Sequence, residues 1–265
     1  MKSLTIIFPI HPLEKEIQKR ISDLESFFAK WPLVTDLLFV LEPGCDEIRR
    51  LLEGVKHEKI NSHFIQNSSW MGRAASLQKG LAQAQGELVI LGSFDLSIPM
   101  AEYFNLIHEA IAVPDISVFK GNRFTSRKKQ SGQRRYWHRV LEDIILEKWR
   151  SGILFKGWVA AKAARESEVQ IEQIAPTEQE KTFKALSQKI AAVEVQDPLC
   201  GLYALRQMRV EELRGERPLK QWYYSLDLLK WIASRNLKLV EIPVVNKVDE
   251  NSKIKLWREF LRFGF

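Results

Sequence analysis

The sequence predicts an α/β protein in which a mostly parallel sheet is flanked by helices. Short apolar, strand-like runs alternate with amphipathic stretches along most of the 265 residues. With 45% hydrophobic residues, a chain of this length can bury the core of one large domain. One run of four apolar residues, 88–91, is followed closely by the carboxylate Asp95. Ligand-binding residues of open α/β sheets occupy this position, beyond the carboxyl ends of the strands.

The individual elements follow from this alternation. Strands are expected at residues 4–10, 36–41, 59–65, 87–92, 115–120, 201–205 and 237–245, and helices at residues 13–30, 46–53, 70–85, 100–112 and 136–150. Such an order builds a parallel sheet covered by helices on both faces. Asp46 is expected to be an N-cap, and Pro99 separates a strand from the next helix.

The alternation stops after residue 150. Residues 151–196 form a charged, helix-prone segment, which we interpret as a helical insertion within a single domain spanning residues 1–265. Its apolar beginning, residues 153–159, is compatible with two arrangements. One is contact with a membrane surface or a partner, and the other is an amphipathic hairpin packed on its own sheet.

The net charge of +7 is concentrated in one segment. Residues 120–139 contain eight Lys and Arg residues and no acid. Because arginine binds phosphate through two parallel hydrogen bonds, a phosphate-binding surface is one interpretation, and a solvated loop is the other. The segment lacks a known nucleic-acid-binding motif and lies within an α/β pattern, so no nucleic-acid partner is expected.

Composition indicates the cellular setting. Two cysteines, Cys45 and Cys200, are too few for a disulfide framework. The longest apolar runs fall far short of the roughly 20 residues that cross a bilayer. The first residues are interpreted as a strand rather than a signal peptide, because no small-residue cleavage site follows them. We therefore expect a cytoplasmic protein.

Asp95 has two interpretations on these observations alone. A carboxylate released at the end of a buried strand is placed to hold a metal ion or a polar substrate. Aspartate is also a common helix cap, and a helix is expected to begin at residue 100.

Several motifs occur in an order that is typical of one enzyme family. They are the strand containing Pro9 and residues 72–80, 86–99, 121–123, 197–203, 222–229, 240–245 and 252–255. In these motifs the chain resembles the family 2 glycosyltransferases with the GT-A fold, in particular the dolichol-phosphate and polyprenyl-phosphate sugar synthases. The resemblance covers the chain apart from residues 151–196.

The resemblance implies transfer of a sugar from a nucleotide sugar to a lipid phosphate, with Mg²⁺ or Mn²⁺ neutralising the leaving diphosphate. Asp95 matches the second acid of the family's Asp-x-Asp metal motif. Arg123 matches the arginine that faces the acceptor phosphate, and Arg134 or Arg135 would be a second clamp. Asp197 and Asp227 are candidates for the general base or for a supporting acid.

The remaining candidates contact substrates. Trp222 either lines the sugar or acceptor pocket or packs in the core, and Lys253 is expected to bind substrate. The donor-side candidates are Pro9, His11, Glu14, Glu42, Gly72, Arg73 and Ser93. His11 is either a base-stacking or metal-assisting group or a partly buried polar residue. Cys200 is expected to pack beside Gly201 rather than to act as a nucleophile.

The donor side departs from the family pattern at three places. Ser93 replaces the first acid of the metal motif, which predicts weaker binding of a divalent ion. Glu42 alone keeps the charge where the family has an Asp-Asp-Gly-Ser run that holds the base and ribose. Glu14 is the one polar residue retained from the motif after the first strand.

Residues 253–265 are expected to form a basic amphipathic helix. Lys and Arg alternate there with large apolar residues, a pattern that fits an anionic membrane surface. The alternative is a C-terminal helix packed on the sheet. The leading hypothesis is a glycosyltransferase peripheral to the inner face of the membrane. The alternative is a degenerate, non-catalytic GT-A protein that binds nucleotide or acts as a scaffold.

Overall fold

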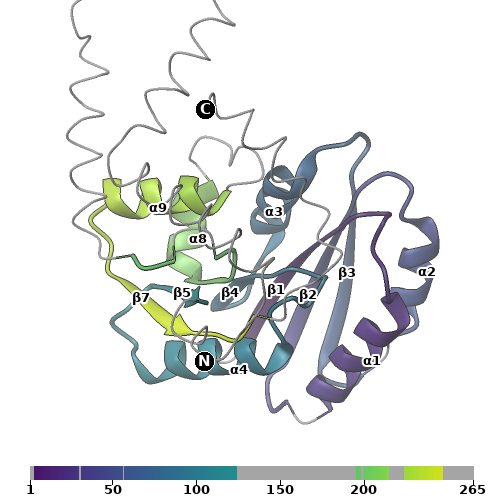
Figure 1. The fold of residues 1–265 in the computed structure, drawn as a ribbon, viewed down its shortest axis with the longest axis horizontal. Coiled ribbons are helices and arrows are strands. Elements are labelled where there is room, and N and C mark those ends of the chain that lie inside the picture. The colour runs from purple at the N-terminus through teal and green to yellow at the C-terminus, as the bar shows by residue number, and fades with distance from the viewer. Residues whose placement is uncertain are drawn as a thin grey trace, which may run out of the picture. The chain divides into compact units, whose positions relative to one another are not determined.

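A computed structural model of the protein describes residues 3–29, 31–55, 57–123, 195–197, 200–214 and 224–246. All of them belong to one unit, which comprises residues 1–128 and 195–247. Within it, seven strands form a single sheet in the order β3-β2-β1-β4-β6-β5-β7 (Figure 1). The predicted insertion at 151–196, the helix at 136–150 and the helix at 253–265 lie outside the described residues except for 195–196.

The sheet is mostly parallel, as predicted. Its strands are β1 (Ser3–Ile10), β2 (Val34–Leu41), β3 (Ile60–Gln66), β4 (Leu88–Leu91), β5 (Val118–Asn122), β6 (Tyr203–Arg206) and β7 (Leu239–Pro243). Among these, β6 alone is antiparallel, paired with β4 on one side and β5 on the other. The amino end of β6 therefore lies at the same edge of the sheet as the carboxyl ends of the other six strands.

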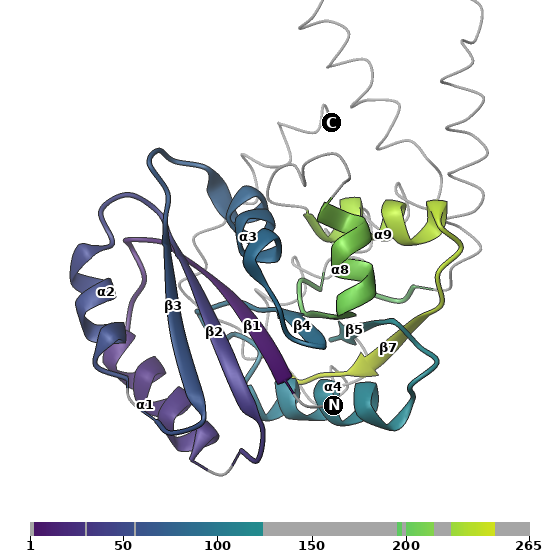
Figure 2. The ribbon, with the colours of Figure 1, turned by 180° about the vertical axis from the view of Figure 1, so that it is seen from behind.

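Helices cover both faces (Figures 1 and 2). They are α1 (Ile17–Phe28), α2 (Asp46–Glu53), α3 (Gly72–Gln83), α4 (Met100–Ala112), α8 (Gln207–Arg214) and α9 (Tyr224–Ser234). Helix α3 packs on β1 and β2 and contacts α8, while α1 contacts α2 and α4. The approach of α3 to the sheet requires glycine, since a Cβ atom on Gly80 would lie 2.3 Å from Cγ2 of Ile7.

Burial explains why the strand predictions held. Residues of β1, β2 and β4 are mostly apolar and mostly buried, as expected of strands covered on both faces. Two local predictions were wrong. Helix α1 begins at Ile17 rather than at residue 13, because a turn closed by the Glu14 N–H and the His11 carbonyl precedes it. Cys45, not Asp46, is the N-cap of α2, and Asp46 lies in its first turn.

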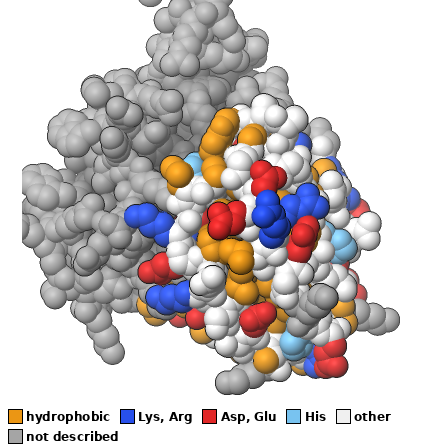
Figure 3. Space-filling model, turned by 90° about the vertical axis from the view of Figure 1, so that its right-hand side faces the viewer, with side chains coloured by type: hydrophobic (Ala, Val, Ile, Leu, Met, Phe, Trp, Pro, Cys, Tyr) orange, Lys and Arg blue, Asp and Glu red, His pale blue; other side chains and the backbone are white. Residues whose placement is uncertain are grey.

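The outer surface near β3 mixes both signs of charge (Figure 3). Arg49 and Glu53 of α2 form an ion pair of 2.8 Å, and Lys19 and Glu16 beside α1 form one of 3.4 Å. Such pairs contribute little stability at the surface and identify a solvated face. In the described part of the chain, no helix is long and apolar enough to cross a membrane.

Candidate functional site

Most of the described candidate residues lie at one edge of the sheet. Pairing of Ile10 with Leu41 and of Ile7 with Leu91 brings together the carboxyl ends of β1, β2 and β4. Pairing of Lys120 with Tyr203 places the end of β5 beside the start of β6. Side chains that follow these strands therefore face a common region.

Glu42 follows β2 and caps helix α3. One carboxylate oxygen accepts the Gly72 N–H at 2.8 Å and the Ser76 hydroxyl at 3.0 Å, and the other accepts the Met71 N–H at 3.0 Å. The side chain is 4% exposed. A carboxylate is favourable at the amino end of a helix, where N–H groups lack partners within the helix. Both oxygens that we expected to hold base and ribose are thus engaged by the chain itself.

Asp95 lies in a tight turn after β4. Its carboxylate accepts the Ser97 N–H at 2.9 Å, and Leu96 has a φ of 48°, a left-handed conformation that is unusual for leucine. Burial raises the pKa of Asp95, but the charge of Arg73 and hydrogen bonds from Ser97 and Ser93 outweigh it and lower the pKa. The N-cap position of α4 is Pro99, so Asp95 does not cap that helix.

Arg73, in the first turn of α3, reaches the same turn. Its Nη2 donates to the Gly92 carbonyl at 3.3 Å, and its guanidinium carbon lies 5.4 Å from the ring centre of Tyr224. The hydroxyl of Tyr103 accepts the Ser93 N–H at 3.0 Å and fixes the start of the turn from α4. Arg73, Ser93 and Asp95, three of the predicted residues, are therefore brought together.

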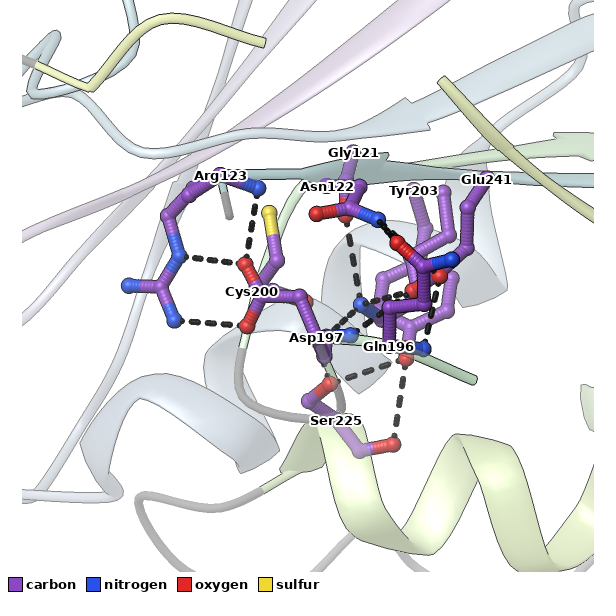
Figure 4. A network of polar contacts seen from close by, with 10 residues as sticks. Gly121, Asn122, Arg123, Gln196, Asp197, Cys200, Tyr203, Ser225 and Glu241 are labelled. Atoms are coloured by element: carbon purple, nitrogen blue, oxygen red, sulfur yellow. Dashed lines mark hydrogen bonds and ion pairs between the residues drawn. The ribbon is translucent and has the colours of Figure 1, made fainter. Parts of the chain in front are cut away.

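Arg123 and Asp197 form a second cluster (Figure 4). Arg123 Nε and Nη2 each donate to a carboxylate oxygen of Asp197 at 2.8 Å, and its backbone N–H donates at 2.9 Å. Asp197 is fully buried. Burial raises its pKa, but Arg123 and the charge of Lys120 outweigh that effect and lower it to about 2. These contacts favour a supporting role for Asp197 over that of a general base.

Lys120 and Glu241 connect this cluster to the sheet. The Lys120 ammonium is fully buried, donates to the carbonyls of Gly121 and Asp197, and lies 3.4 Å from a carboxylate oxygen of Glu241. Glu241 of β7 also accepts the backbone N–H groups of Gln196 and Asp197. Sequence reasoning missed both residues, although a lysine directly after Val118 and Phe119 in a strand signals a buried, paired cation.

The other candidates have varied positions. His11 Nδ1 accepts the Leu13 N–H at 3.0 Å, and its ring lies 5.0 Å from that of Trp70, which is 60% exposed. Glu14 forms an ion pair with Arg20 of α1. Pro9 lies within β1, and Asp227 lies 3.8 Å from Lys230 in α9. Arg134, Arg135, Trp222 and Lys253 lie outside the described residues.

Both cysteines are buried. Burial raises the pKa of Cys45 to about 11 and also raises that of Cys200. The Cys200 sulfur packs closely against Gly121, since a Cβ atom added to that glycine would lie only 2.9 Å from it. A thiol that is packed and protonated in this way is a poor nucleophile, in agreement with the packing role expected for Cys200.

Solved structures share this arrangement of strands and helices. Glucosyl-3-phosphoglycerate synthase from Mycobacterium tuberculosis, in complex with Mn²⁺, UDP and phosphoglyceric acid, is 15% identical, with a TM-score of 0.59 over 98% of this chain and 75% of that one. The mannosyltransferase PcManGT from Pyrobaculum calidifontis, with GDP-Man and Mn²⁺, is 15% identical, with a TM-score of 0.56 over 96% of this chain and 59% of that one. The chain has the GT-A glycosyltransferase fold.

Sequence comparison adds no closer relative. No protein-family model matches the chain, and no curated protein matches it. TarS of S. aureus, residues 1–349, shares the GT-A fold at 15% identity, with a TM-score of 0.51 over 91% of this chain and 58% of that one. At these identities, similarity of structure establishes the fold and leaves activity to be argued from the site.

A divalent ion accompanies nucleotide in several of these GT-A structures, which hold Mn²⁺ or Mg²⁺ as the resemblance implied. The present site offers such an ion few ligands. Among the described residues, no three His, Cys, Asp or Glu side chains are grouped to hold a metal. Ser93 contributes only a neutral oxygen, and the Arg73 cation lies beside Asp95. The described donor set therefore does not fit a tightly held dication.

Proposed function

We propose that the protein is a glycosyltransferase that moves a hexose or similar sugar from a nucleotide sugar to a polyprenyl phosphate or related anionic acceptor. One observation carries the proposal. Asp95, after β4, and Arg73, which reaches the same turn from helix α3, lie at the same edge of a GT-A sheet as Arg123, after β5. A site for the donor diphosphate can therefore face an acceptor site beside Arg123, whose guanidinium is also paired with Asp197.

The chemistry needs few protein groups. The bond between the anomeric carbon and the diphosphate oxygen breaks, and its electron pair leaves with the nucleoside diphosphate. An oxygen of the acceptor phosphate forms the new bond to that carbon. A phosphate acceptor is already ionised, so no general base is required. This agrees with an Asp197 carboxylate that is paired with Arg123.

Transfer assays with labelled nucleotide sugars test the proposal. UDP-linked and GDP-linked hexoses are each offered with polyprenyl phosphate and, separately, with 3-phosphoglycerate as a soluble anionic acceptor. We expect a labelled lipid product, and we expect Asp95→Asn to reduce its formation at least about 100-fold, because the substitution removes the carboxylate whose charge acts on Arg73 and that accepts the Ser97 N–H in the turn after β4. Asp23→Asn, on the exposed side of α1, is the matched control and should retain full activity.

The acceptor and the alternative function are decided by the same assay. If product forms only with 3-phosphoglycerate, the acceptor is a soluble phosphate compound and the proposed lipid acceptor is wrong. Nucleotide binding without transfer to either acceptor would favour the non-catalytic GT-A module. Two observations favour this alternative. The Glu42 carboxylate already accepts N–H groups at the start of α3, and the metal motif keeps only one acid.

Membrane attachment through residues 253–265 is also part of the proposal. Four Lys and Arg residues there would each contribute roughly 1 kcal/mol near an anionic leaflet. The full chain should float with phosphatidylglycerol-containing vesicles at low salt and less in high salt. Lys253→Glu/Lys255→Glu should reduce flotation, while neutral vesicles recover little protein. Failure of the parent chain to float at low salt would contradict attachment.

A further inference from the structure

The guanidinium of Arg73 is fixed by several parts of the fold. It hydrogen-bonds to the carbonyl of Gly92 after β4 and lies over the ring of Tyr224 in α9. The Tyr224 hydroxyl in turn donates to the Gly201 carbonyl before β6. Arg73 is therefore held in place at the end of β4 before any ligand arrives.

Its hydrogen-bonding capacity is incompletely used. Within the described part of the chain, Nε of Arg73 is buried and has no hydrogen-bond partner. A guanidinium has five N–H donors in a planar fork, and buried donors of this kind normally find an acceptor. An anionic group such as a phosphate is the strongest acceptor for them. The N–H groups of Met71 and Gly72 nearby are already used by Glu42, so the guanidinium is the main donor offered there.

The charge of the pair matches that of a metal-containing site. Two carboxylates with a dication sum to zero charge, and Asp95 with Arg73 also sums to zero. Here Ser93 takes the place of one acid, and Arg73 on helix α3 supplies the positive charge. The net charge that a donor diphosphate would encounter is therefore the same as in a metal-containing site. The proximity of Arg73 also opposes a second cation beside Asp95, because like charges repel.

We propose that Arg73, held near Asp95 by the Gly92 carbonyl and the Tyr224 ring, replaces the divalent ion as the main positive charge for the donor diphosphate. The inference rests on the proposed function. It goes beyond that function by stating that nucleoside diphosphates bind in EDTA and that a divalent ion adds little. Loss of the charge-assisted bonds from Arg73 should weaken binding in EDTA by about 10- to 150-fold.

Calorimetric titration with UDP, GDP, ADP, CDP and dTDP tests the inference, each in EDTA and in excess Mn²⁺. For the preferred nucleotide, the parent dissociation constant should differ less than about threefold between the two conditions. Arg73→Met should bind weakly in both, whereas Arg50→Met on the exposed part of α2 should bind as the parent does. Arg73→Met/Ser93→Asp restores the acid pair and should bind nucleotide only with Mn²⁺.

The outcomes separate the two proposals. If the parent binds only with Mn²⁺, the role of Arg73 is refuted while the proposed function stands. If no nucleotide binds in either condition, both fail. Unchanged binding by a folded Arg73→Met would also overturn the inference. If Arg73→Met does not fold, Arg73→Lys is used instead, because it keeps the positive charge. In addition, the nucleotide affinity of the parent in EDTA and in Mn²⁺ tests the inference without any variant.

Discussion

Replacing Asp197 by alanine is expected to lower the free energy of unfolding by about 3–5 kcal/mol, because the change leaves the partly buried Arg123 cation without its counter-charge. The Asp197 carboxylate accepts three hydrogen bonds from Arg123 and is fully buried. Urea denaturation followed by circular dichroism measures the loss. Asp23→Ala, at an exposed position of α1, should change stability by less than about 0.5 kcal/mol.

The same pair gives the expected pH dependence. The pKa of Asp197 is about 2 in the folded protein, against an ordinary value of 3.8. Because the folded pKa is the lower one, the stabilisation is present above pH 4 and is lost as the pH falls towards 2. It amounts to about 2 kcal/mol. The stability difference between the parent and Asp197→Ala should therefore shrink over this range, and a constant difference would contradict the assigned ion pair.

Glu42→Gln is the second change with a large expected effect, about 2–4 kcal/mol. Glutamine supplies one acceptor oxygen where glutamate supplies two, and its amide group would face an N–H donor at the amino end of α3. Hydrogen exchange should accelerate in the first turn of α3, and urea denaturation should report the lost stability.

Nucleotide preference distinguishes capping from base recognition. If Glu42 caps α3, the ranking of UDP, GDP and ADP should stay the same in Glu42→Gln. If stability is unchanged and the ranking shifts, Glu42 holds the base and ribose as the family pattern implied. Gln78→Glu, a half-buried position further along α3, controls for a charge change within the same helix.

The sheet was predictable because its strands are buried on both faces and therefore appear as apolar runs. The orientation of β6 was not, since apolar character does not distinguish parallel from antiparallel strands. Helix α8 was missed as well, because its polar sequence has little helical periodicity, with only Val210 and Leu213 buried.

The site was predictable only in part, for a related reason. Asp95, Arg73 and Arg123 follow strands or begin a helix, and their positions along the chain suggest a common edge. Their partners come from distant segments. Asp197 is 74 residues from Arg123, and no local pattern indicates their pairing. The use of the Glu42 carboxylate by α3 likewise depends on tertiary packing.

The antiparallel strand β6 has a consequence for how this chain can vary. The described chain stops at Arg123 and resumes at residue 195, and the ion pair between Arg123 and Asp197 joins these two ends within the described unit. The separation of these two ends is therefore fixed by the sheet, and in general a doubling of loop length between fixed ends costs only about 0.6 kcal/mol. Evolution can lengthen, shorten or exchange this stretch while the strands keep their register. Changes in the length of this stretch need not disturb the residues around Asp95.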